Sequence, residues 1–348
     1  MTTPEPVPGE VRDVEGRSQG QIVRRRFHRH RGALAGMLTL TVVAVLAYSS
    51  VGALGLPGWW KWDSFTPGDV QDGGSPTLSL PRWLGGRGFA IGAHPFGQDE
   101  IGRDAFARTM KGTQTSLNVM VVVIVLAALI GMGVGALAGY FRGWVDQLLM
   151  RTTDLFITFP VIVIGAVLGK LAGGAGPFWL AVALGCITWT ALARLVRGEF
   201  LTLREREFVD AAKVAGAGSF RIMRKHLLPN AVGVVIVNTT LLASTAVLLE
   251  TSLSYLDFGV QPPGVSLGTM IAEYQSAFTT RPWLFWWPGL FIVLIALSVN
   301  FIGDGLRDAF DPRQRRVPGG RSPDPAAARE REVARRDAGH QPLDRPGA

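Results

Sequence analysis

The sequence predicts an all-α integral membrane protein with six transmembrane helices. Nearly half of its 348 residues, 48%, are apolar. Several stretches contain no charged residue over a length that would cover the hydrocarbon of a bilayer. Lysine and arginine gather in the segments that join these stretches on one side. So many charge-free helices in one soluble chain would leave little surface for water, which excludes a soluble fold.

The chain opens with a segment, residues 1–31, that is poor in apolar residues and rich in Pro, Gly, Arg and Glu. Such a composition cannot bury enough apolar surface to offset the entropy of folding, so we expect a disordered cytoplasmic tail. The same composition predicts a second disordered cytoplasmic tail at residues 307–348. Arg24, Arg25 and Arg26 precede the membrane, where we expect them to bind anionic lipid.

The first transmembrane helix is predicted at residues 32–56, in the charge-free stretch between Arg31 and Lys61. A cleavable signal peptide has an apolar region of only about 7–15 residues and no long tail before it. We therefore expect this helix to remain as a membrane anchor.

An extracytoplasmic segment is predicted at residues 57–111. Glycine and proline interrupt its first part too often for regular elements, whereas residues 105–117 have a helical pattern that leads into the second span. Between these parts, His94, Asp99 and Asp104 resemble metal ligands in type. Only His94 is a strong ligand for transition metals, so we favour helix capping and salt bridges for these residues and predict no metal site.

Five further spans complete a core predicted over residues 112–306. Four lie in charge-free stretches, and each exceeds the ~20 residues that cross roughly 30 Å of hydrocarbon. These stretches are residues 112–141, 171–193, 226–249 and 282–303. The third span, 155–172, contains Lys170 near its end, where a long side chain can reach the interface. Residues 144–151 before it have the pattern of a short helix on the cytoplasmic surface.

Two spans contain residues with a predicted packing role. Gly131, Gly135 and Gly139 follow one another at intervals of four in the second span and leave one helix face without side chains. Such a face lets another helix approach closely, so we expect helix packing there. Glu250 and Asp304 are the charged residues nearest the hydrocarbon, and we favour packing over a transport pathway for both.

The orientation follows from the basic residues. Of the 35 lysines and arginines, 27 lie in residues 1–31, 142–154, 194–225 and 307–348. The positive-inside rule therefore places both termini in the cytoplasm. The net charge of +8 does not predict a nucleic-acid partner, because the basic residues are spread over four segments without an aromatic-rich binding module.

The cytoplasmic loop at residues 194–230 has the most informative pattern. An apolar stripe at i, i+3, i+4 and i+7 is formed by Phe208, Ala211, Ala212 and Ala215. Gly216 is expected to end this helix, Ser219 to cap a second one, and Pro229 to turn the chain back into the membrane. A stripe of alanines offers a shallow surface that suits a groove on another protein. A helix lying on lipid is the alternative, although it would favour bulkier side chains.

This loop resembles a known motif. Asp210-Ala211-Ala212, three residues, Gly216, nine residues and His226-Leu227-Leu228-Pro229 resemble the E-A-A loop of bacterial ABC importer permeases. Asp210 stands for the usual Glu, and His226 replaces Ile as in the peptide-importer branch. Four more motifs resemble the C-type permease of dipeptide and oligopeptide importers, so that the resemblance covers roughly residues 91 to 313. They are residues 94–104, 139–146, 253–263 and 303–313.

The resemblance implies a type I ABC permease fold in a bacterial inner membrane and a transporter with several subunits. Its partners would be a second homologous permease, two cytoplasmic ATPase subunits and an extracytoplasmic peptide-binding protein. The loop would couple to an ATPase through Phe208, Asp210, Ala211, Ala212, Ala215, Gly216, His226, Leu228 and Pro229. The chain itself is expected to have no catalytic residues and no cofactor, since ATP would be bound by the partners and the phosphate-binding pattern G-x-x-x-x-G-K-[ST] is absent from the sequence.

Two alternatives remain open at this point. A nickel or nickel-chelate importer would have nearly the same permease. A self-sufficient secondary transporter belongs to another class and would require internal repeats and ionisable residues near the middle of the membrane, which the sequence does not show by inspection.

Overall fold

The computed structural model describes residues 19–310, except 54, 80–82, 84–87, 89 and 173–175. Its regular elements over these residues are helices, together with three isolated antiparallel bridges. The predicted disorder of residues 1–18 and 311–348 lies outside the described residues.

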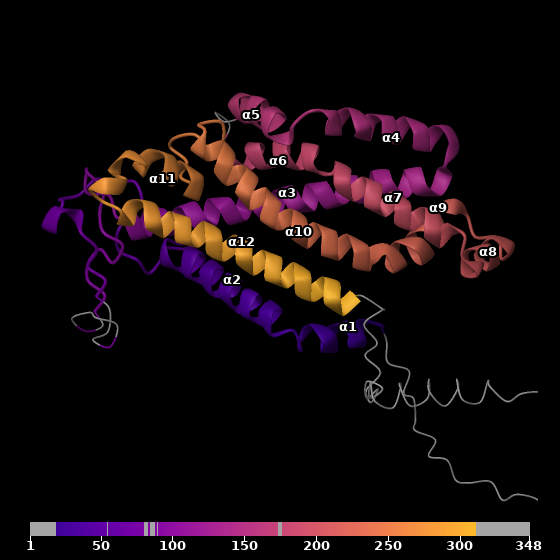
Figure 1. Cartoon of the computed structure of the whole chain (residues 1–348), viewed down its shortest axis with the longest axis horizontal. Coiled ribbons are helices and arrows are strands. Elements are labelled where there is room, and N and C mark those ends of the chain that lie inside the picture. Colours follow the sequence, from indigo (N-terminus) through magenta and orange to yellow (C-terminus); the bar gives the residue numbers. More distant parts are fainter. Residues whose placement is uncertain are drawn as a thin grey trace, which may run out of the picture. The chain divides into compact units, whose positions relative to one another are not determined.

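Figure 1 shows the helices side by side in a bundle. Their bounds are α1 Gln19–Phe27, α2 Arg31–Ser50, α3 Ala105–Phe141, α4 Gly143–Thr158, α5 Val161–Ala172, α6 Pro177–Thr188, α7 Thr190–Arg204, α8 Glu207–Val214, α9 Ser219–Ile222, α10 Leu228–Tyr255, α11 Leu267–Tyr274 and α12 Trp283–Phe310. Two 3₁₀ turns lie at Asp72–Gly74 and Ser276–Thr279, and a π-helical turn, Met223–Leu227, joins α9 to α10.

The described chain has four helical stretches long and apolar enough to cross a membrane, and six such spans if each of two bent pairs counts as one. The four are α2, α3, the continuous stretch from α9 to α10, and α12. The pair α4 and α5 bends by 84° at Phe159-Pro160, because proline lacks the N–H that would continue the helix. The pair α6 and α7 bends by 42° at Trp189.

The third span differs from its prediction. α5 has 12 residues, about 18 Å of helix, which is too short for the hydrocarbon thickness. α4 does not end near Arg151 as a short surface helix but continues to Thr158 and lies along α3 and α7. A complete third span therefore requires α4 as its first half.

The tail before the first span contains a helix, so the prediction of disorder is wrong for residues 19–27. α1 packs against α12. His30 then accepts a hydrogen bond from the backbone N–H of Ala33 at 3.0 Å, which caps α2, and its Nε2 lies 3.5 Å from the carboxylate of Asp308. The contacts with α12, which begins more than 250 residues after α1, cannot be read from local composition. The first span also ends at Ser50 rather than Leu56, since Gly52 at φ +76° turns the chain.

α3 is the central helix of the bundle and packs against α2, α6, α7 and α10. Its last third holds the three glycines of the predicted packing face. A Cβ atom added at Gly131, Gly135 or Gly139 would lie 2.8, 2.5 and 2.8 Å from backbone carbonyl oxygens of α7 or of the adjoining Trp189. The glycines therefore permit the close contact between α3 and α7.

Much of the apolar surface of the spans is not buried within the chain. In the most apolar part of the four long spans, 22 to 33% of the residues are buried. The other residues of these windows leave apolar side chains such as Leu38, Val125 and Val293 at the surface. This surface is available to lipid or to another membrane protein.

Candidate coupling site

The loop between α7 and α10 carries α8 at one end of the bundle, the same end that holds α1 (Figure 1). α8 packs against the chain through Val209, which is fully buried, and Ala212, which is half-buried. Both contact an apolar cluster that includes Phe200 of α7 and Ile222 of α9. α8 is thus held by a narrow face, and its remaining surface is open.

The exposed side of α8 only partly matches the predicted stripe. Phe208, Ala211 and Ala215 are exposed, but Ala212 turns toward the chain's own cluster. Val214, which lies outside the predicted stripe, is 91% exposed. Val209 and Ala212 lie at i and i+3, so the periodicity is helical as predicted, but the inward face is rotated by one position. The sequence could not distinguish the inward from the outward apolar face.

Asp210 lies on the solvent side of α8. Its carboxylate accepts a hydrogen bond from the ammonium of Lys213, one turn away, at 2.9 Å. Both side chains are well exposed, so this pair contributes little to stability. The charge of Asp210 therefore remains accessible beside Ala211.

Gly216 ends α8 in the way the sequence predicts. Its φ of +78° is a left-handed conformation, which only glycine adopts without strain. Its N–H donates to the carbonyl of Lys213 at 2.9 Å, and the N–H of Ala217 donates to the carbonyl of Ala212 at 3.0 Å. These two bonds form a Schellman motif, which satisfies the last carbonyls of the helix.

The second half of the loop differs from its prediction at two residues. Ser219 does not cap a helix with its side chain; it is the first residue of α9, after an extended Gly218. Pro229 does not turn the chain, since α9, the π-helical turn and α10 form one stretch. In an α-helix the ring of Pro229 would clash with the carbonyl four residues earlier. The π-helical turn, in which the N–H of Leu228 donates to Met223, accommodates the proline without ending the helix.

The remaining residues of the predicted coupling set lie on this continuous helix. His226 is half-buried, and its carbonyl accepts a hydrogen bond from the Asn230 side chain at 2.6 Å. Leu228 is half-buried and Pro229 is exposed. Phe220, outside the predicted set, is 72% exposed on α9. The loop thus presents Phe208, Ala211, Val214, Ala215 and Phe220 as apolar groups that the chain does not cover.

Polar contacts connect α7 and the residue that follows it to the segment 139–146. The sequence did not predict a role for this segment. Arg197 of α7 donates from Nε and Nη2 to the two oxygens of Asp146 at 2.5 and 2.6 Å. Arg204 donates to the carbonyl of Tyr140 and lies over its ring, 5.4 Å from the centroid. Arg142 pairs with Glu205, the residue after α7. Side-chain partners so far apart in sequence leave no local signal.

The opposite end of the bundle contains the segment 94–104 that precedes α3. Asp104 caps α3 by accepting the N–H of Ala107 at 2.6 Å and also binds His94, which confirms the predicted capping role. Asp99 accepts a hydrogen bond from the hydroxyl of Tyr274 at 3.0 Å and from Arg103 at 2.5 Å. Burial raises the pKa of Tyr274, so its hydroxyl stays protonated and able to donate.

One carboxylate connects this segment with α11. Glu273 accepts hydrogen bonds from Arg103 and from Arg108, one on each carboxylate oxygen. Arg108 is almost fully buried, and its guanidinium also lies over the ring of Tyr274 at 5.7 Å. The beginning of α3 is thereby joined to α11 by paired charges.

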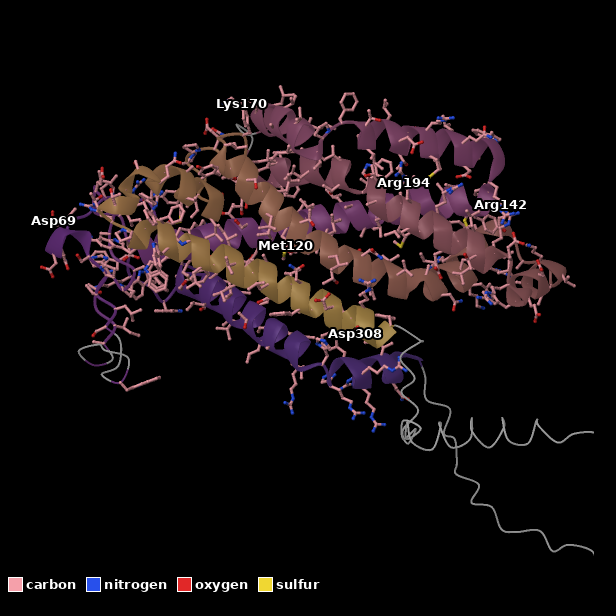
Figure 2. All side chains as sticks on the ribbon, viewed as in Figure 1. Asp69, Met120, Arg142, Lys170, Arg194 and Asp308 are labelled. Carbon is pink, nitrogen blue, oxygen red and sulfur yellow. The ribbon has the colours of Figure 1, made fainter. Side chains whose placement is uncertain are left out.

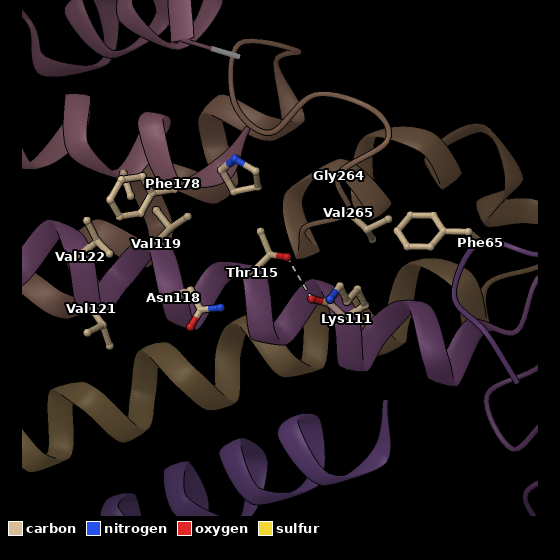
Figure 3. Close-up of a pocket in the computed structure, with 12 residues that line it drawn as sticks. Phe65, Lys111, Thr115, Asn118, Val119, Val121, Val122, Phe178, Gly264 and Val265 are labelled. Carbon is tan, nitrogen blue, oxygen red and sulfur yellow. Dashed lines mark hydrogen bonds between the residues drawn. The ribbon is translucent and has the colours of Figure 1, made fainter. Parts of the chain in front are cut away.

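A cavity of about 520 Å³ lies beside the first half of α3 (Figure 3). Lys111, Thr115 and Asn118 of α3 give it a polar wall, and Phe178 and Ala181 of α6 give it an apolar wall. In the same region Glu250 of α10 is fully buried and accepts hydrogen bonds from two serine hydroxyls. Its geometry matches the helix-packing role expected for it. The cavity offers both polar and apolar groups.

Comparisons with known proteins give the family. A family described as binding-protein-dependent transport system inner membrane component matches residues 131–316. A putative peptide permease protein of Brucella ovis is 38% identical over 302 residues, 85% of this chain and 92% of that protein. The oligopeptide transport system permease protein OppC of Mycobacterium tuberculosis is 37% identical over 303 residues, 87% of this chain and 97% of that protein.

OppC of Haemophilus influenzae is 35% identical over 306 residues, 88% of this chain and 92% of that protein. The backbone also aligns weakly with the inward-facing methionine ABC transporter MetNI, with a TM-score of 0.48 and 21% identity over 57% of this chain and 95% of that chain. On the family match and the relatives' identity over most of its length, the chain belongs to the inner membrane components of binding-protein-dependent transport systems.

Proposed function

We propose that this chain is the permease subunit of an ATP-driven importer of dipeptides and oligopeptides. The cargo is supported by the names of the relatives, which are peptide and oligopeptide permeases. Two ATPase subunits, a second homologous permease and an external peptide-binding protein would complete the transporter. The chain would bind no ATP itself and have no cofactor.

The single observation that carries the coupling role is the open face of α8. Phe208, Ala211 and Val214 are exposed although they are apolar, and α8 has only 8 residues. A helix this short is marginal without packing, so a surface that its own chain leaves uncovered fits a groove on a partner. The small side chains of Ala211 and Ala215 would permit close contact with an ATPase subunit.

The proposed mechanism is alternating access. ATP-driven closure of the two ATPase subunits would displace α8 of this chain and the corresponding helix of the second permease. The two permeases would then open their shared passage first to one side of the membrane and then to the other. The cavity beside α3, with its polar and apolar walls, is suited to a cargo of variable side chains. The permease would provide a passage and would not alter the peptide.

The coupling role is tested by Ala211→Arg in the assembled transporter. The long charged side chain would lie where the ATPase contact is proposed, without disturbing the buried Val209. We expect normal membrane abundance, loss of ATPase co-purification and loss of peptide uptake. Thr279→Arg is the control: Thr279 is exposed in the 3₁₀ turn that follows α11, which Figure 1 shows at the opposite end of the bundle from α8, and this change should affect none of these. Normal uptake by Ala211→Arg with the ATPase still bound would contradict the proposal.

The cargo is tested separately with the wild-type transporter in vesicles. Uptake of labelled dipeptides and oligopeptides that depends on ATP and on the binding protein would support it. Uptake of nickel or a nickel chelate without peptide uptake would show that the cargo is nickel and not peptide. The proposed coupling role of α8 would be unaffected.

A further inference from the structure

α4 is held to the bundle by few apolar contacts. Over its whole described length, Thr153 is the one residue that is fully buried. Trp144, Leu148 and Leu155 are 74, 57 and 62% exposed. Apolar packing within the chain therefore fixes the position of α4 only weakly.

Two ion pairs provide the attachment that packing does not. Arg197 binds both oxygens of Asp146 at 2.5 and 2.6 Å, and Arg194 binds Asp154 at 2.5 Å. The two arginines lie one turn apart on α7, and the two aspartates lie on α4, which runs antiparallel to it. Figure 2 shows Arg194 beside α4 and Arg142 nearer the end that holds α8. We call Arg197–Asp146 and Arg194–Asp154 the α4–α7 ion pairs.

The Arg197–Asp146 pair is geometrically the more restrictive of the two. A bidentate contact fixes the guanidinium plane as well as its distance from the carboxylate. The Asp146 side chain is 16% exposed and that of Arg197 34%, whereas both side chains of the other pair are half exposed. Partial removal from water strengthens the attraction and makes an unpaired charge costly. Asp146 and Arg197 should therefore move together.

α7 leads directly into the coupling loop. Its last residue, Arg204, is followed by Glu205 and by Arg206, which is the N-cap of α8. Glu205 is itself paired with Arg142 at the junction of α3 and α4. Only Glu205 and Arg206 separate α7 from α8, so a displacement of α8 would act directly on α7.

On its other side α4 leads to α5 through the 84° bend at Pro160. α5 packs against α6 and α10, and α6 supplies Phe178 and Ala181 to the wall of the cavity. Because the two helices are joined through this bend, a tilt of α4 would displace α5. Chain order and contacts therefore connect α8, α7, α4, α5 and the cavity wall in sequence.

We infer that the α4–α7 ion pairs transmit the displacement of the coupling loop to the broken span formed by α4 and α5, with Asp146 and Arg197 as the principal positioning residues. This inference rests on the proposed role of α8 as the contact with the ATPase. It assigns a function to Asp146, a residue of the motif at 139–146 for which the sequence predicted no role.

The first test measures coupling in the reconstituted transporter. Asp146→Asn and Arg197→Gln should each reduce peptide uptake per ATP hydrolysed about tenfold, while assembly with the ATPase persists. The exchanged pair, Asp146→Arg with Arg197→Asp, should recover most of the ratio because it restores the attraction. Asp257→Asn removes the exposed pair with Lys170 at the opposite end and should leave the ratio unchanged. A proportional fall in uptake and hydrolysis, or no recovery in the exchanged pair, would overturn the inference.

The second test does not depend on the cargo. Spin labels at Val167→Cys on α5 and Val45→Cys on α2, both exposed positions, report the distance between these helices in a Cys186→Ala background. Trapping the ATPase with ADP and vanadate should shift this distance in the parent protein and not in Asp146→Asn. An equal shift in both proteins, or no shift in the parent, would overturn the inference. Failure of peptide uptake with a normal shift would instead count against the proposed cargo alone.

Discussion

The imidazole Nδ1 of His94 lies 2.7 Å from the carboxylate Oδ2 of Asp104, and both residues are 2% exposed. The other carboxylate oxygen accepts hydrogen bonds from the N–H of Ala107 and from the indole of Trp60. Asp104 therefore caps α3 and holds the preceding segment against it with one side chain.

Loss of the Asp104 charge should destabilise the protein. Asp104→Asn keeps the size of the side chain but offers one acceptor oxygen where three donors converge, so about 1–3 kcal/mol should be lost. Thermal unfolding in detergent measures the effect, and Asp104→Ala should lower the midpoint further. Asp69→Asn, an exposed change at the same end, is the control. A midpoint in Asp104→Asn equal to that of the control would show that the buried pair does not stabilise the fold.

The contact between α3 and α7 gives a prediction with a matched control in the same helix. A Cβ at Gly135 would lie 2.5 Å from the carbonyl oxygen of Ala193, so Gly135→Ala should force the helices apart and cost about 1–3 kcal/mol. Gly133 has no atom within 4 Å of such a Cβ, so Gly133→Ala should stabilise the helix by up to about 1 kcal/mol. Unfolding midpoints that change in the same direction for both variants would contradict the packing role.

The end of α8 gives a second matched pair. No atom would contact a Cβ at Gly216 or Gly218, but φ is +78° at Gly216 and −68° at Gly218. Gly216→Val should therefore cost about 1–2 kcal/mol through backbone strain alone and accelerate amide hydrogen exchange in α8 about tenfold. Gly218→Val should leave the exchange rates close to those of the wild type. Equal rates in the two variants would mean that the loop adopts another conformation at Gly216.

The predicted orientation is tested by cysteine labelling in Cys186→Ala. Ser219 begins α9, Ser276 follows α11, and both residues are exposed. Figure 1 shows α9 and α11 at opposite ends of the bundle. Because the basic residues gather on the side of Ser219, a cysteine there should react with a membrane-impermeant reagent only after cells are opened. A cysteine at Ser276 should react in intact cells. The reverse pattern would place α8 outside the cell and remove its proposed contact with the ATPase.

The sequence was sufficient for the fold class and the family. Charge-free stretches predicted the four long spans and the bent span of α6 and α7, since the hydrocarbon thickness sets their length, whereas the extent of the third span was not predicted. The motifs predicted the family that the comparisons confirm, which also decides against a secondary transporter. The left-handed conformation of Gly216 could also be predicted from the sequence, because the left-handed position after a helix favours glycine.

Other features could not be predicted because they depend on contacts between distant residues. α1 forms where the composition suggested disorder, since it packs against α12. The inward rotation of Ala212 depends on a cluster formed by α7 and α9. The pairing of Asp146 with Arg197 joins residues 51 positions apart. Pro229 differs from its prediction for a local reason, because a π-helical turn lets a helix accommodate a proline that would otherwise end it.

Because α9 and α10 form one continuous helical stretch, the second half of the loop moves together with the span that follows it. The stretch Ser219–Tyr255 has 37 residues and is about 55 Å long, well beyond the roughly 30 Å of hydrocarbon. A force applied near Phe220 would therefore tilt the whole stretch, including Glu250. The helical backbone of the loop is interrupted at Gly216 and Gly218, between α8 and α9. α8 is joined to α9 through these residues, whereas a tilt of α9 carries α10 with it because no break separates the two helices.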